Sequence, residues 1–178
     1  DYGLSKQEVS NPTGAMSYAA WIYLSAAPAN TAQYGLLTNY SSKYGFKIYG
    51  NGVGNPVLLY RSEYNNGTLN YGTTQIPLNT WTHVAFVVDA LGQNTSLKLY
   101  VNGATDALAT NNTIYTAPHL YALGSDSTPA VIQGKIDDSR LYSRTLTSTE
   151  VAAIYNAGTS LAANIAAAPG YGFITVQP

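Results

Sequence analysis

The chain has 178 residues and a formal net charge of −1, and charged residues make up only 10% of it, against about a quarter in an ordinary soluble domain. This length favours a single domain with one core, and the low charge, without clustered Lys or Arg, excludes nucleic acid and anionic membrane surfaces as electrostatic partners. The absence of cysteine excludes disulfides and thiolate metal sites, and no apolar run approaches the roughly 20 residues of a membrane-spanning helix.

Short runs rich in Tyr, Val, Ile, Leu and Thr alternate with Gly, Asn, Pro and Ser, a pattern typical of a sandwich of short antiparallel strands. The pattern predicts one domain over residues 1–160, followed by an Ala-rich linker and a strand-like tail over 161–178. The expected strands are Met16–Ser25, Tyr34–Asn39, Tyr44–Tyr49, Val57–Ser62, Thr68–Tyr71, Thr80–Val88, Ser96–Val101, His119–Leu123 and Val131–Tyr142. Asn-Gly pairs such as Asn102-Gly103 indicate hairpin turns between them.

Two of these strands alternate clearly enough to assign their faces. Both faces of Trp81–Val88 are largely apolar, which predicts a central strand with Trp81 in the core. In the next strand, Leu97, Leu99 and Val101 share one face, whereas Lys98 and Tyr100 share the other, so that strand is expected to have one solvated side.

A short helix is predicted after the last of these strands. Thr147 is its expected N-cap, and Glu150, three residues later, completes a capping box. Val151, Ile154 and Tyr155 form an apolar stripe, and Gly158 is the expected stop signal. We therefore expect a short helix that docks by this stripe.

Three segments of the chain carry a family resemblance: the strand pair Thr80–Asp89 and Leu97–Gly103, the segment Gly134–Leu146 with Glu150 and Tyr155, and the early Trp-bearing strand Ser17–Tyr23. Together they resemble laminin-G-like domains of the concanavalin-A-like kind. The resemblance spans roughly Met16 to Gly158, in the order of the family's elements. It implies an all-β, antiparallel two-sheet jelly-roll sandwich with ligands bound at the rim loops or on the concave sheet. It does not imply one function, because this fold hosts binding, adhesive, catalytic and structural members.

The carboxylates do not suggest an enzyme. The only glutamates are Glu8, Glu63 and Glu150, and none shares a strand with a second acid at the spacing that glycoside hydrolysis requires. Asp137 and Asp138 are adjacent and are expected to point to opposite faces, with Asp137 on the core side, where it would pair with His83. We therefore predict a non-catalytic domain.

Calcium is the cofactor to consider, since many laminin-G-like domains bind it with rim carboxylates and backbone carbonyls. Ca²⁺ prefers six to eight oxygen ligands. Asp126 and Asp138 are the best candidate ligands, with Asp89 and Asp106 on other turns. The alternative is that these residues stabilise their own turns by hydrogen bonds.

The tyrosines suggest where a glycan would bind, because an aromatic ring can stack on a sugar ring and the hydroxyl can form a hydrogen bond. A polar and aromatic group occupies the middle hairpins: Tyr40, Tyr44, Tyr49, Tyr60, Tyr64 and Tyr71, alongside Asn65 and Asn66. The equally simple alternative is that Tyr is common in strands. Trp21 and Trp81 are interpreted as core residues.

Two classes of function remain. One is an extracellular, secreted or surface-displayed module that binds a glycan or a cell-surface protein. The other is a structural subunit of a filament, layer or virion, assembled as a homo-oligomer through its sheet edges and the tail Tyr171–Val176. The extracellular assignment agrees with the low charge and with four Asn-x-Ser/Thr acceptors, at Asn39, Asn66, Asn94 and Asn111. The alternative for these acceptors is that such triplets arise by chance in a chain rich in Asn, Ser and Thr.

Overall fold

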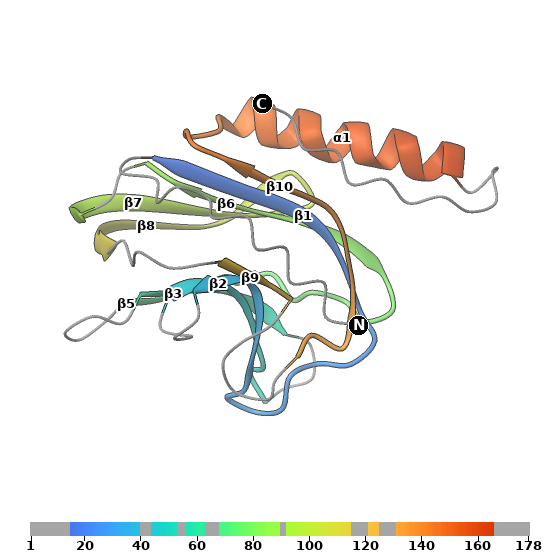
Figure 1. Ribbon diagram of the computed structural model, residues 1–178, viewed down its shortest axis with the longest axis horizontal. Helices are drawn as coiled ribbons and strands as arrows, with labels where there is room; N and C mark the ends of the chain where they lie inside the picture. Colours follow the sequence, from blue (N-terminus) through green and yellow to red (C-terminus); the bar gives the residue numbers. More distant parts are fainter. Residues whose placement is uncertain are drawn as a thin grey trace.

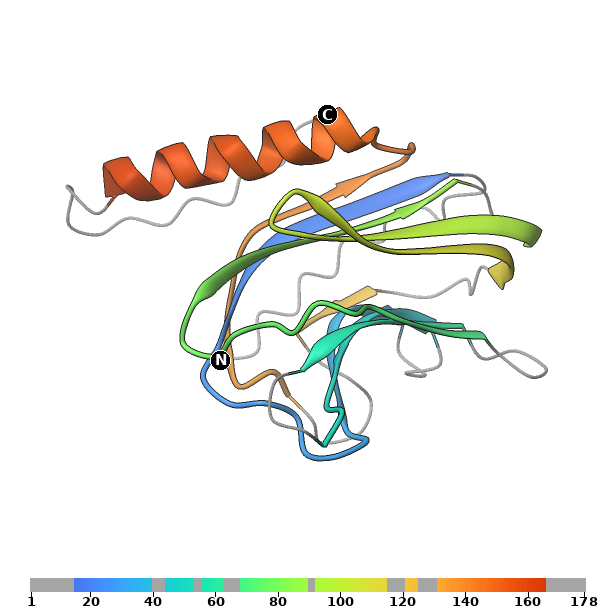
Figure 2. The same ribbon diagram turned by 180° about the vertical axis from the view of Figure 1, so that it is seen from behind.

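The computed structural model describes residues 15–39, 44–52, 56–62, 68–89, 92–114, 121–124 and 131–165. Two five-stranded antiparallel sheets pack face to face (Figures 1 and 2), and the strand order is β10-β1-β6-β7-β8 in sheet A and β5-β4-β3-β2-β9 in sheet B. The strands of sheet A are β1 (Met16–Leu24), β6 (Trp81–Val88), β7 (Gly92–Val101), β8 (Ala104–Ile114) and β10 (Gly134–Tyr142). The strands of sheet B are β2 (Gln33–Asn39), β3 (Tyr44–Tyr49), β4 (Val57–Ser62), β5 (Thr68–Tyr71) and β9 (Tyr121–Leu123).

This architecture confirms the predicted jelly-roll sandwich and the central position of β6, which pairs with β1 and β7. One strand was missed. The segment of β8 is rich in Ala, Asn and Asp, which are weak strand formers. It forms a strand because the turn at Asn102 and Gly103, both with positive φ, places it beside β7.

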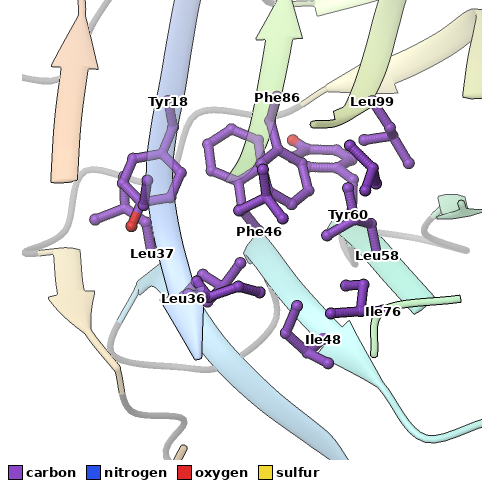
Figure 3. Packing of buried hydrophobic residues seen from close by; sticks show 14 of the residues in the cluster. Tyr18, Leu36, Leu37, Phe46, Ile48, Leu58, Tyr60, Ile76, Phe86 and Leu99 are labelled. Carbon is purple, nitrogen blue, oxygen red and sulfur yellow. The ribbon is translucent and has the colours of Figure 1, made fainter. Parts of the chain in front are cut away.

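The core lies between the sheets, where aromatic rings from both layers meet (Figure 3). Phe46 of β3 stacks on Phe86 of β6 with ring centroids 4.4 Å apart, and Tyr18 of β1 lies 5.8 Å from Phe46. The Tyr18 hydroxyl accepts a hydrogen bond from Ser139 Oγ at 3.0 Å, and burial raises the pKa of this phenol. These contacts join the two sheets through side chains that alternate inward along their strands.

The helix α1 (Ser148–Ile165) lies over the outer face of sheet A (Figure 1). The predicted capping box is confirmed, because the Thr147 and Glu150 side chains each accept the other's backbone N–H, at 3.2 and 2.8 Å. Val151 and Leu146 pack on Ala85, Val87 and Tyr100. In the described part of the chain, no helix is both long and apolar enough to cross a membrane.

The sequence predicted that the helix ends at Gly158, but the structure shows that it continues past this residue. The backbone stays helical to Ile165 and so passes the expected domain boundary at residue 160. A Cβ atom at Gly158 would collide with the indole of Trp21. This glycine therefore allows the helix to approach β1 closely, while the predicted tail strand lies outside the described residues.

The predicted inward position of Asp137 is wrong. Ala19 pairs with Arg140 and Trp21 pairs with Asp137, so β10 contains one more residue than β1 between these two pairs. Asp138 occupies this bulge with φ of 46°. Ser139 and Leu141 still face the core, but the extra residue leaves Asp137 exposed, and it does not pair with His83.

Two predicted exposures on sheet A are also wrong. Trp81 is 41% exposed, because it begins β6 on the outer face, beyond the contacts that α1 makes. Tyr100, which was expected on a solvated side, is buried because α1 covers that part of the face.

Candidate functional site

The outer face of sheet B is the best candidate for a ligand-binding surface. No helix or strand of the described chain covers it, whereas α1 covers the equivalent face of sheet A (Figure 1). Strand alternation decides which side chains this outer face carries. The inward-pointing residues of β3 and β4 are Phe46, Ile48, Leu58 and Tyr60, so the residues next to them in sequence point outward. We call these outward residues the aromatic face: Gln33, Lys47, Tyr49, Leu59, Arg61, Leu69 and Tyr71.

Tyr49 and Tyr71 form the aromatic part of this face. They come from β3 and β5, and their rings meet edge to face across β4, with centroids 4.9 Å apart and planes at 61°. This contact helps to bury Leu59 of β4, which pairs with Tyr71 in the sheet. Tyr71 itself is 41% exposed, and Tyr49 is half-buried. The two rings therefore form a fixed pair with a side open to solvent.

Arg61 and Gln33 form the polar part. Arg61 Nη1 donates a hydrogen bond of 3.1 Å to Gln33 Oε1, and because β3 lies between their strands, this bond crosses β3. Lys47, at the centre of β3 on the same face, is fully buried. Partial burial raises the pKa of Tyr71, the nearby Tyr49 raises it further, and the positive charge of Arg61 opposes the rise. Arg61 is a diagonal neighbour of Tyr71 on this face, because Leu59 pairs with Tyr71 and Arg61 pairs with Leu69.

This combination can bind a polyhydroxylated ring. Aromatic rings stack on the apolar face of a sugar, and a guanidinium fork donates hydrogen bonds in fixed directions to neighbouring oxygens. The amide of Gln33 can both donate and accept. None of the residues of the aromatic face is an Asp or Glu, so the face offers no general acid or base of the glycosidase kind.

The structure places the residues that the sequence predicted for glycan binding in different parts of the fold. Tyr49 lies on the aromatic face together with Tyr71, but Tyr60 is 3% exposed and packs against Phe46 in the core. The prediction for Tyr60 is therefore wrong, since alternation along β4 turns its ring away from solvent. Tyr44 is placed by its backbone opposite Ser62, and its side chain is not described. Tyr40, Tyr64, Asn65 and Asn66 lie outside the described residues.

The aspartates proposed for calcium have other partners where they are described. Both carboxylate oxygens of Asp138 accept hydrogen bonds from Arg140, at 2.7 and 2.8 Å, so this carboxylate is already paired with a cationic side chain. Asp89 accepts from the backbone N–H and hydroxyl of Ser96. Asp126 lies outside the described residues.

No group of three or more His, Cys, Asp or Glu side chains in the described ranges is arranged to hold a metal ion.

Sequence reasoning missed Arg61 and Gln33. The alternation of Leu58 and Tyr60 inward could have placed Arg61 on the outer face, but the bond to Gln33 depends on the pairing of β2, β3 and β4. That pairing cannot be read from one strand alone.

The family of the chain follows from comparison with known proteins. Residues 1–152 match the family model described as the concanavalin A-like lectin/glucanases superfamily. The chain belongs to this superfamily. The comparison with curated protein sequences gave no match.

Several solved structures share the fold. Domain 4 of AbnA, a GH43 extracellular arabinanase from Geobacillus stearothermophilus solved with arabinotriose, is 25% identical, with a TM-score of 0.62 over 83% of this chain and 68% of that one. A heptameric SAP-like pentraxin from Limulus polyphemus is 15% identical, with a TM-score of 0.61 over 80% and 71%. The binding domain of Paraclostridial Mosquitocidal Protein 1 is 17% identical, with a TM-score of 0.64 over 84% and 38%.

Proposed function

We propose that this domain is a non-catalytic glycan-binding module and that its ligand lies on the aromatic face of sheet B. The observation that carries the proposal is the ring pair of Tyr49 and Tyr71, in which Tyr71 is 41% exposed, beside the bridge between Arg61 and Gln33. The rings supply a stacking surface, and the bridge supplies directed donors and acceptors. The arabinotriose complex of AbnA domain 4 supports a saccharide as the class of ligand.

A saccharide also suits the charge of this face. Arg61 and Lys47 are its only ionisable residues apart from the tyrosines, and Lys47 is fully buried. A neutral or weakly acidic sugar therefore fits better than a cationic ligand. We place the module outside the cell, in keeping with the low charge of the chain and its Asn-x-Ser/Thr acceptors.

The alternative function, a structural subunit, relies on the sheet edges and on the tail over residues 161–178. No observation on the described part of the chain favours that role over glycan binding, so we do not develop it further.

A glycan-array screen tests the proposal, with the parent and the Tyr71→Ala variant compared in excess CaCl₂ and in excess chelator. We expect the parent to bind a defined class of glycans and the variant to lose about tenfold or more in affinity. A parent that binds no glycan in either condition would overturn the proposal. The two conditions also test the prediction of calcium.

A further inference from the structure

A second group of exposed aromatic and polar residues lies on the opposite side of the sandwich. On the outer face of sheet A, Trp81 pairs with Tyr23 in the register of β6 and β1, and Tyr23 pairs with Lys135 of β10. One row along the strands, Trp21 pairs with Asp137. We call Tyr23, Asn79, Trp81, Lys135 and Asp137 the Trp81 patch.

The rings of this patch are braced by their neighbours. Trp81 and Tyr23 lie 5.7 Å apart, with their planes tilted by 58°. The ammonium of Lys135 lies 5.7 Å from the Tyr23 centroid, and the Tyr23 hydroxyl donates to Asn79 Oδ1 at 3.4 Å. Tyr23 is therefore held in place by Lys135 and Asn79, which leaves the indole of Trp81 as the open surface.

The packing of α1 explains why this surface remains uncovered. Tyr155 stacks on Trp21, one row before Tyr23, and sheet A bends away from the helix toward the end of β1 (Figures 1 and 2). Trp81 is 41% exposed, and Asn79, Lys135 and Asp137 are exposed as well. A large exposed indole among polar side chains is the arrangement expected of a binding surface rather than of a core.

The geometry points to a second saccharide-binding site, in which a neutral sugar ring stacks on Trp81. Lys135 donates hydrogen bonds to the sugar hydroxyls, Asp137 accepts them, and the Asn79 amide donates. The single positive and single negative charge of the patch balance, which favours a neutral saccharide over an acidic one. This site goes beyond the proposed function, because it lies across the sandwich from the aromatic face and would let one module bridge two glycan chains.

The two tryptophans of the chain allow a direct test by ¹⁹F NMR of protein labelled with 5-fluorotryptophan. Trp81→Phe assigns the two resonances. The probes are arabinotriose, maltotriose, cellotriose, chitotriose and trigalacturonic acid, each added to millimolar concentration. We expect at least one neutral trisaccharide to shift the Trp81 resonance saturably and to leave the Trp21 resonance nearly unchanged.

Variants separate this site from the aromatic face. The shift should persist in Tyr71→Ala, and Lys135→Ala should weaken it severalfold, whereas the matched exposed lysine variant Lys98→Ala should not. The inference is overturned if no neutral trisaccharide moves the Trp81 resonance, if only trigalacturonic acid does, or if the resonance moves with protein concentration alone, as contact with a second copy would cause. These outcomes do not depend on whether the aromatic face binds a glycan.

Discussion

The indole of Trp21 stacks on the phenol ring of Tyr155, with centroids 5.6 Å apart and planes at 27°, and this contact fixes α1 on sheet A. His83 completes the cluster, at 5.5 Å from Trp21 and 5.9 Å from Tyr155. Both ring nitrogens of His83 and the indole nitrogen of Trp21 are buried without a hydrogen-bond partner in the described structure. The helix is thus held by ring packing over a few polar atoms whose burial opposes docking.

Gly158→Ala should destabilise the protein, although Ala normally stabilises a helix by about 1 kcal/mol relative to Gly. The added Cβ would collide with the Trp21 indole and lift this part of α1 from β1. Chemical denaturation followed by tryptophan fluorescence measures the effect. The control is Ala157→Gly at the exposed neighbouring position, which should cost about 1 kcal/mol through helix propensity alone. A Gly158→Ala protein more stable than the parent would show that the close approach is absent.

His83 should make stability depend on pH in a defined window. Burial lowers its pKa from 6.5 to about 4, while the negative charge of Asp138 opposes this. As the pH falls, His83 takes up a proton near pH 6.5 in the unfolded chain but only near pH 4 in the folded protein. The free energy of unfolding should therefore decrease between pH 6.5 and about 4, by about 3 kcal/mol in total. Below pH 4, His83 should contribute no further change.

The measurement is the free energy of unfolding at a series of pH values for the parent and for His83→Gln. The variant should lack the slope between pH 6.5 and 4. Both proteins should still lose stability from pH 4.5 to about 2, since the hydrogen bond from Arg144 lowers the pKa of Glu150 to about 2. A parent and a variant with the same slope above pH 4.5 would show that His83 is not buried as a neutral ring.

Trp81→Ala should change stability by no more than about 1 kcal/mol, because the ring is already partly in water. Phe86→Ala, in contrast, should cost about 3–5 kcal/mol, since this ring is fully buried between Phe46 and Tyr18. Thermal denaturation of both variants compares the two positions directly. Equal losses would place Trp81 in the core and remove it from the second site.

Asp106 should stabilise one edge of the sandwich. It lies on β8 of sheet A, whereas Thr73 and Thr74 follow β5 of sheet B. Its Oδ1 accepts hydrogen bonds from the Thr73 N–H, the Thr73 hydroxyl and the Thr74 N–H, at 3.0, 3.0 and 2.7 Å. Asp106→Ala should cost about 2–3 kcal/mol, because a charged acceptor is lost. Asp106→Asn retains an acceptor oxygen and should cost less, as urea denaturation would show. An alanine variant as stable as the parent would mean that the edge is closed by other contacts.

The sequence allowed the fold to be predicted further than the site. Local signals are sufficient for most strands, though not for β8, and for the capping box at Thr147, because alternation and capping involve neighbours in sequence. The bulge at Asp138 and the burial of Tyr100 depend on pairing with β1 and on docking of α1, which one strand does not reveal. The aromatic face also depends on strand pairing, since Tyr49, Arg61 and Tyr71 come from three strands and meet only when sheet B forms.

An amide chemical-shift map of a saccharide complex tests the central claim most directly. In a ¹H–¹⁵N titration with the glycan that binds most strongly in the array, the account predicts that the largest shifts fall on β3, β4 and β5, around Tyr49, Arg61 and Tyr71. These shifts should be lost in Tyr71→Ala, whereas Leu108→Ala, at an exposed apolar position of sheet A, should leave them unchanged. Saturable binding whose shifts all lie away from sheet B would contradict the account.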